Sequence, residues 1–169
     1  MRTVAIRVMS QADLDEVLKI AAGDLNAPNW PRSAYTTALE PEAKPRRIAL
    51  VAEAPTTSQI AAFCVARVIS TEAELETIVT EAGSRRRGVG RMLFANLTTQ
   101  VEQAGATEIF LEVRESNHAA REFYEALGFS EAGRRTAYYT DPAEDAVLMR
   151  LALGARRGKD MPGGTYPQM

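Results

Sequence analysis

Four arginines and two glycines gather in one short run, Ser84 to Arg91, between an apolar stretch and an amphipathic one. The first turn of a helix offers unpaired N–H groups and a partial positive charge, so it suits a phosphate group. Glycines there let the backbone approach the anion, and arginines add charge-assisted hydrogen bonds. The run therefore predicts a site for a nucleotide-like diphosphate, formed by Arg85, Arg86, Arg87, Gly88, Val89, Gly90 and Arg91.

The run does not match the two common phosphate-binding motifs. A dinucleotide-binding fingerprint would need glycine at the position of Leu93, and a P-loop would need a Gly-Lys-Ser/Thr sequence. Two other interpretations stay open: a solvated arginine turn whose glycines serve helix packing, and a contact with nucleic acid. Against the second, no further basic patch or aromatic array accompanies the run, so no direct nucleic-acid binding is expected.

Glu112 stands among Phe110, Leu111 and Val113, where a carboxylate is unusual unless it has a partner or a chemical task. A positioned carboxylate can remove a proton from a reacting group, which contributes roughly 100- to 10,000-fold in rate. The structural alternative is a glutamate paired with a cation on an open face of the strand. Glu76 is the second candidate for the base.

Tyr124 falls at helical spacing with Ala120 and Leu127, so core packing alone would explain it. A phenol with an ordinary pKa of about 10 is also suited to protonate a leaving thiolate. His118 is expected to be solvated in the first turn of a helix rather than to act as a base. Cys64 lies in an apolar run and is expected to be buried.

The composition excludes several other chemistries. A single histidine and a single cysteine leave no basis for a histidine zinc site, a serine–histidine hydrolase or a disulfide framework, so no metal is expected. The net charge of −2 creates no general attraction to nucleic acid or membranes. The longest apolar run, 60–66, is far shorter than the ~20 residues of a membrane span, and the first residues do not resemble a signal peptide. We therefore expect a cytoplasmic protein.

The elements that must hold these residues follow from the hydrophobic pattern. Alternating and β-branched runs predict strands, and apolar residues three and four positions apart predict helices. Asn117 is expected to cap a helix that ends at Gly128 in the left-handed conformation. The predicted strands are 3–8, 47–54, 59–69, 74–81, 107–114, 129–139 and 146–153, and the predicted helices begin near Ser10, Pro31, Gly88 and Asn117.

Early antiparallel strands followed by strand–helix alternation predict an α/β (α+β) fold. About seven strands would form one mixed central sheet, flanked on both faces by about four helices. A length of 169 residues favours a single domain, which is expected over residues 1–153. Residues 154–169 are rich in glycine and proline and are expected to form a flexible C-terminal tail.

The pattern Arg85-x-x-Gly88-x-Gly90, between a strand and a helix, resembles the acetyl-CoA pyrophosphate loop of the GCN5-related N-acetyltransferases (GNAT superfamily). The run 111–117, LEVRESN, followed by the AA pair at 119–120, the FY pair at 123–124 and the LGF triplet at 127–129, resembles the ribosomal-protein alanine N-acetyltransferases, the RimI-type branch. Tyr138-Tyr139 before Asp145 and, more loosely, 29–33 fit the same branch. The chain departs from it at 80–84, where Thr80 replaces an apolar residue and EAGS replaces an Asp-Pro turn.

The resemblance implies acetyl-CoA as the cosubstrate, Glu112 as the general base, acting directly or through water, and Tyr124 as the general acid. It also implies that a backbone N–H near Val79 stabilises the developing oxyanion. Ile78, Val79 and Thr80 would lie along the cofactor and offer backbone groups to it. The segment Arg86 to Arg91 would hold the pyrophosphate, and Asn117 would contact the pantetheine or the phosphate part of the cofactor.

The acceptor implied by the same branch is a protein N-terminus, an N-terminal alanine of a small-subunit ribosomal protein. A small amine, such as a polyamine, an antibiotic or an amino acid, is the alternative acceptor, and a non-catalytic CoA-binding module is a further alternative. Aromatic loop residues suit contact with a peptide end, although packing at the edge of the core explains them equally. The candidate acceptor contacts are Trp30, Tyr35, Glu76, Tyr138 and Tyr139.

Overall fold

The computed structural model describes residues 3–154, and the expected flexible tail beyond residue 154 lies outside the described residues. Within residues 3–154 the chain forms one seven-stranded sheet and four α-helices, which confirms the predicted mixed sheet with helices on both faces. The strands are β1 (Ala5–Val8), β2 (Arg46–Glu53), β3 (Ile60–Ile69), β4 (Glu72–Thr80), β5 (Glu108–Arg114), β6 (Ser130–Thr140) and β7 (Ala143–Ala152), and the helices are α1 (Leu14–Ala22), α2 (Arg32–Ala38), α3 (Val89–Gln103) and α4 (His118–Leu127).

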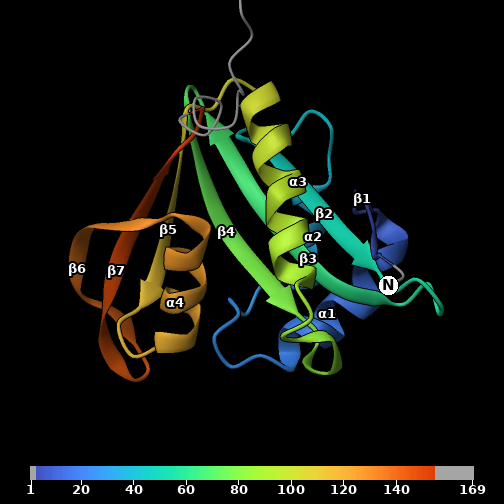
Figure 1. Ribbon diagram of the computed structural model, residues 1–169, viewed down its shortest axis with the longest axis horizontal. Helices are drawn as coiled ribbons and strands as arrows, with labels where there is room; N and C mark the ends of the chain where they lie inside the picture. The colour runs from blue at the N-terminus through green and yellow to red at the C-terminus, as the bar shows by residue number, and fades with distance from the viewer. Residues whose placement is uncertain (1–2, 155–169) are drawn as a thin grey trace, which may run out of the picture.

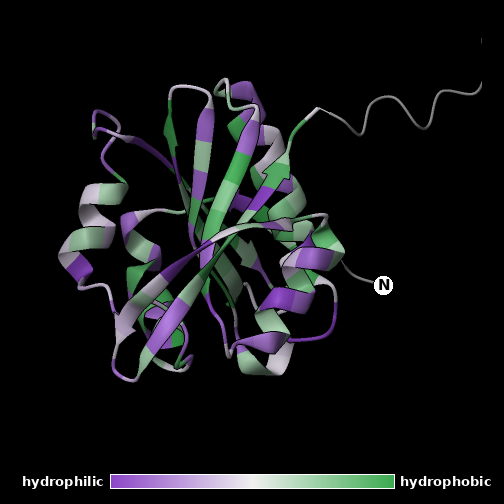
Figure 2. Cartoon of the chain, turned by 90° about the vertical axis from the view of Figure 1, so that its left-hand side faces the viewer, coloured by the Kyte–Doolittle hydropathy of each residue, from purple (hydrophilic) through white to green (hydrophobic). Residues whose placement is uncertain are grey.

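The strands run in the order β1-β2-β3-β4-β5-β7-β6, and β4 and β5 are the parallel pair at the centre. All other neighbours are antiparallel. The central strand β3 is apolar along almost its whole length because both of its faces are buried, as the run 60–68 predicts. In the other half of the sheet, hydrophobic and hydrophilic residues alternate along the strands (Figure 2).

Two hydrophobic cores lie on opposite faces of the sheet. One is formed with α3 and α4 and contains Leu93, Leu97 and Leu111; the other is formed with α1 and α2 and contains Leu14 and Phe63. Figure 1 shows α3 over the first half of the sheet and α4 over the second half, with α1 and α2 behind. Cys64 lies in the first core, completely buried as expected, and burial raises the pKa of its thiol to about 12.

The sheet splits between β4 and β5. These strands pair only through Glu72–Glu74 and Glu108–Phe110, and beyond that short ladder they diverge (Figure 1). A β-bulge lies where β4 leaves β5, because Thr77 and Leu75 face consecutive residues of β3 and Glu76 is the extra residue between them. The split leaves the last six residues of β4, 75–80, paired with β3 alone.

Candidate active site

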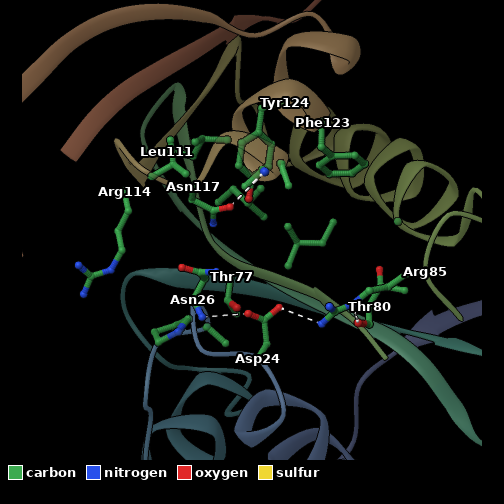
Figure 3. A pocket seen from close by; sticks show the side chains of 18 of the residues that line it. Asp24, Asn26, Thr77, Thr80, Arg85, Leu111, Arg114, Asn117, Phe123 and Tyr124 are labelled. Carbon is green, nitrogen blue, oxygen red and sulfur yellow. Dashed lines mark hydrogen bonds and ion pairs between the residues drawn. The ribbon is translucent and has the colours of Figure 1, made fainter. Parts of the chain in front are cut away.

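A cavity of about 610 Å³ fills the split between β4 and β5. In Figure 3, Asp24, Asn26 and Thr80 lie below the cavity, and Asn117 and Tyr124 lie above it. Its walls come from β4, β5, the loop before α3, the start of α4, the α1–α2 loop and the tip of β6. The lining residues with polar or aromatic side chains are Asp24, Asn26, Glu76, Thr77, Thr80, Ser84, Arg85, Arg86, Arg91, Glu112, Arg114, Asn117, Phe123, Tyr124 and Tyr139.

The start of α3 is open to an anion. Gly88, which precedes the helix, adopts the left-handed conformation with φ of 78°, and Arg86 has φ of 59°. No side chain caps this 15-residue helix, and a Cβ added at Gly88 would meet nothing within 4 Å. The first N–H groups of the helix therefore remain accessible, beside a partial positive charge that favours phosphate.

Gly90 has a different function from Gly88. A Cβ at Gly90 would lie 3.3 Å from the Thr80 hydroxyl and 3.4 Å from the Phe123 ring. The missing side chain lets α3 approach β4 and α4 closely, so the packing interpretation of the glycines holds for this position.

The four arginines of the run do not act alike. Arg86 and Arg91 line the cavity, and no carboxylate of residues 3–154 lies within ion-pair distance of either guanidinium. Arg85 instead contacts other parts of the protein: its Nε donates to the Thr80 carbonyl at 3.0 Å, and its guanidinium lies 3.3 Å from the Asp24 carboxylate. Arg87 is exposed and does not line the cavity. The charge available to a diphosphate therefore comes mainly from Arg86 and Arg91.

The free edge of β4 forms one wall. Ile78 and Thr80 line the cavity, whereas Val79 is 3% exposed, faces the core beneath α1 and α2, and is not part of the lining. A strand edge without a neighbour offers N–H and C=O groups to an extended ligand, as an added strand would take them up. This wall and the start of α3 together fit a long ligand that carries amide groups and ends in a pyrophosphate.

Both candidate bases line the cavity, but their partners differ. Glu76 receives two hydrogen bonds from Arg47, at 2.8 and 3.1 Å, and its side chain is 9% exposed. Glu112 pairs with Arg135 at 2.9 Å, and the Arg135 side chain is 59% exposed. Tyr138 does not line the cavity, but its hydrogen bond to Glu112 raises the pKa of its hydroxyl. The buried bidentate pair fixes Glu76, and the solvated arginine leaves Glu112 the more available carboxylate.

Tyr124 projects from α4 into the cavity (Figure 3). Its ring contacts those of Phe123 and Phe129, with centroids 5.5 and 5.7 Å away. Burial raises the pKa of the Tyr124 hydroxyl, which keeps it protonated at neutral pH. The side chain therefore both packs and presents a proton donor, so the two interpretations are compatible.

Asn117 begins α4 as the sequence predicts. Its side-chain oxygen accepts the N–H of Ala120 at 3.2 Å, and Gly128 ends the helix with φ of 103°. Asn117 also lines the cavity, so the cap lies at the helix end that faces the ligand. The neighbouring His118 is exposed and is not part of the lining.

The predicted acceptor contacts are only partly brought together. Tyr139 lines the cavity, with the Arg114 guanidinium 4.1 Å from its ring centre, but Trp30 and Tyr35 do not. Tyr35 is 1% exposed and packs against Trp30 and Phe63 in the core beneath α1 and α2, which makes it unsuitable as a wall of the pocket. Sequence reasoning missed Arg114 and the α1–α2 loop residues Asp24, Asn26, Ala27 and Pro28. The loop carries no motif, whereas Arg114 lies two positions after Glu112 on the same side of β5.

Comparisons with known proteins agree with this arrangement. The acetyltransferase (GNAT) family model matches residues 14–129. The chain is 42% identical to a ribosomal protein bS18-alanine N-acetyltransferase of Escherichia coli over 97 residues, which is 56% of this chain but only 66% of that protein, just under two thirds. A putative bS18-alanine N-acetyltransferase of Bacillus subtilis is 32% identical over 149 residues, which is 88% of this chain and 95% of that protein.

Solved structures share the fold. The crystal structure of the Escherichia coli ribosomal-protein-S18-alanine N-acetyltransferase superposes with a TM-score of 0.77 and 30% identity, over 98% of this chain and 99% of that one. Naa20 of Chaetomium thermophilum, solved with a bisubstrate analogue, gives a TM-score of 0.79 at 22% identity, over 93% and 90% of the two chains. In the part of the chain that is described, no helix combines the length and apolarity of a membrane span.

Proposed function

Because the chain belongs to the acetyltransferase (GNAT) family, we propose that it transfers the acetyl group of acetyl-CoA to the N-terminal α-amine of a protein. One observation carries the proposal: the anion-accessible start of α3 and the free edge of β4 lead along one cavity to Glu112 and Tyr124. A pure binding module would need the first two features but neither the carboxylate nor the phenol.

The lining fits two parts of acetyl-CoA, the pyrophosphate and the pantetheine arm. The N–H groups at the start of α3, with Arg86 and Arg91, would hold the pyrophosphate. The edge of β4 at Ile78 and Thr80 would hold the pantetheine amides, with Asn117 on the opposite wall. When bound there, acetyl-CoA supplies the acetyl group as a thioester.

We assign Glu112 as the general base and Tyr124 as the general acid. The Glu112 carboxylate takes one proton from the acceptor ammonium, directly or through a water molecule, so that the amine nitrogen carries a free electron pair. The nitrogen forms the bond to the acetyl carbon as the carbon–sulfur bond breaks, and the Tyr124 hydroxyl gives its proton to the leaving sulfur. The new amide nitrogen then gives its second proton to the Tyr124 phenoxide, directly or through water, which leaves a neutral amide and restores the phenol. Burial raises the pKa of Tyr124, so this side chain is a phenol and not a phenoxide before the reaction begins.

The acceptor that the relatives support is the N-terminal alanine of ribosomal protein bS18, the substrate in the names of the Escherichia coli and Bacillus subtilis proteins. A ribosomal acceptor would place the reaction in the cytoplasm, as the sequence predicts.

The test is release of the CoA thiol with peptides that begin with alanine, serine or methionine, measured beside a panel of polyamines and amino acids. We expect turnover with the alanine peptide and none with the same peptide already acetylated at its N-terminus. Turnover with small amines alone would assign a small-molecule acetyltransferase instead. Binding of acetyl-CoA without turnover of any acceptor would leave a non-catalytic CoA-binding module.

A further inference from the structure

Arg85 is the first arginine of the run Ser84 to Arg91, yet its side chain is held by protein groups. Its Nε donates to the carbonyl of Thr80 at 3.0 Å, and its terminal nitrogen lies 3.3 Å from Oδ2 of Asp24. Arg85 thus joins the end of β4 to the loop between α1 and α2. A guanidinium held on two sides has fewer donors left for a phosphate than the guanidinium of Arg86 or Arg91.

Asp24 is the matching residue in the α1–α2 loop. Its Oδ1 accepts the N–H of Asn26 at 2.9 Å, and its Oδ2 faces Arg85, so one carboxylate orders the turn and ties it to β4. The dashed lines in Figure 3 mark both contacts. Apart from the Arg85 pair, the hydrogen bonds that segment 24–28 makes within the described chain stay inside the loop or reach the end of α1.

Segment 24–28 forms the wall of the cavity on the side where the acceptor must arrive. Leu111 and Val113 belong to the core beneath α3 and α4, so the alternating Glu112 and Arg114 face the other side of the sheet. The α1–α2 loop lies on that same side, since its helices cover it. Asp24 and Tyr124 line the same cavity, and burial and then the negative charge of Asp24 raise the pKa of Tyr124.

We propose that the Asp24–Arg85 pair is a positioning device for the acceptor: it holds segment 24–28 in place as a wall of the acceptor site, and Arg85 is not a ligand of the cofactor pyrophosphate. The proposal rests on the proposed function for its kinetic test. It assigns different tasks to neighbouring arginines, with Arg86 and Arg91 serving the cofactor and Arg85 serving the acceptor.

The kinetic test compares Arg85→Ala, Asp24→Ala and the double variant. Both groups are partly exposed, so we expect the KM of the acceptor peptide to rise about 2- to 5-fold in each single variant, with kcat and the Kd of acetyl-CoA near the wild-type values. The double variant should be no worse than Asp24→Ala, because Arg85 and Asp24 share one contact and Asp24→Ala already removes it together with the bond to the Asn26 N–H. Asp24→Asn removes the negative charge but keeps a side-chain oxygen for the Asn26 N–H. Comparing it with Asp24→Ala therefore shows how much of the effect comes from the ion pair and how much from the hydrogen bond within the turn.

The matched control is Arg150→Ala. Arg150 pairs with Glu108 away from the cavity, and its side chain is 50% exposed compared with 48% for Arg85. This variant should leave both the KM of the peptide and the Kd of acetyl-CoA unchanged. A rise in the Kd of acetyl-CoA in Arg85→Ala, as large as that in Arg86→Ala, would overturn the proposal, and so would additive effects of the two single changes.

A second measurement keeps the proposal testable if no peptide is turned over. Amide hydrogen exchange of residues 24–27, which all carry a backbone N–H, should become faster in Arg85→Ala and in Asp24→Ala, but not in Arg150→Ala, with no ligand present. Unchanged exchange in this segment would refute the positioning role, whatever the acceptor. Faster exchange without any acetyl transfer would instead support the pair and refute the proposed function.

Discussion

The cavity has two sides that are built in different ways. The cofactor side consists of the edge of β4 and the start of α3, which come from one continuous stretch of chain, 75–91. The acceptor side is assembled from the α1–α2 loop, the end of β5 and the tip of β6, which are far apart in sequence. The first side offers mainly backbone groups and arginines, and the second offers side chains held by ion pairs.

This difference separates what the fold supplies from what individual side chains supply. A strand edge and a helix start are consequences of the split sheet, so their binding groups persist through many substitutions. The acceptor side depends on contacts such as Asp24–Arg85 and Arg114–Tyr139, each of which a single change removes. We therefore expect that changes on the two sides can be told apart by whether acetyl-CoA binding or acceptor turnover responds.

The largest effect is expected at Glu112, where the two sides meet. Glu112→Gln keeps the shape of the side chain but removes the base, so kcat should fall roughly 100- to 10,000-fold while the Kd of acetyl-CoA stays within about twofold. Steady-state thiol release and calorimetric titration measure the two quantities.

Two variants control for this change. Glu108→Gln alters the same strand at a similar exposure, 21% for Glu108 and 17% for Glu112, and should leave kcat unaffected. Glu76→Gln should affect kcat less than Glu112→Gln does. An equal or larger loss in Glu76→Gln would transfer the role of the base to Glu76.

The next effect belongs to the cofactor side alone. Arg86→Ala removes a cation that lines the cavity without a carboxylate partner in the described chain, and the Kd of acetyl-CoA should rise about 10-fold. The loss should shrink at high salt, because screening already weakens the wild-type contact. Titrations of acetyl-CoA at two salt concentrations measure the change in Kd. The control is Arg46→Ala, because Arg46 is an exposed arginine outside the cavity. An unchanged Kd in Arg86→Ala would contradict the assignment of the pyrophosphate site.

The cofactor side was also the easier one to predict from sequence. Arginines and glycines in one run, Asn117 as a cap and Gly128 as a left-handed helix end are local signals, and the structure has them where they were expected. The split between β4 and β5 depends on which strands pair, so no local pattern reports it. Helical spacing could not show that Tyr35 points into the core, and composition could not show that Arg85 faces Asp24.

A third effect tests how the acceptor side is supported. Asp13, just before α1, accepts hydrogen bonds from Arg7 and Ser10, and these hold its pKa at about 2, below the ordinary 3.8. A lowered pKa means that the carboxylate stabilises the fold at pH values above 3.8 and that this contribution is lost as the pH falls toward 2. Asp13→Asn should therefore lower the free energy of unfolding by about 2 kcal/mol at pH 7.

Urea unfolding at several pH values checks this effect. The difference between wild type and Asp13→Asn should be constant above about pH 5 and should shrink between pH 4 and pH 2. Asp15→Asn is the control, because the side chain of Asp15 is 88% exposed and its pair with Arg32 is solvated, so its cost should stay below about 0.5 kcal/mol. A difference that does not change with pH would refute the ion pair as the source of the stability.

The smallest effect concerns Gly88, the glycine before α3, which can be required for its left-handed backbone conformation or for the space that it leaves to the pyrophosphate. Gly88→Ala places a Cβ on a residue with φ of 78°, which should cost about 1 kcal/mol of unfolding free energy. Gly88→Asn should cost less than half of that, because asparagine tolerates the left-handed region. A Cβ at this position would meet nothing within 4 Å apart from the adjacent residues, and we propose that the pyrophosphate lies in that space. Asparagine should therefore restore stability without restoring the Kd of acetyl-CoA, and a wild-type Kd in Gly88→Asn would show that this space is not part of the cofactor side.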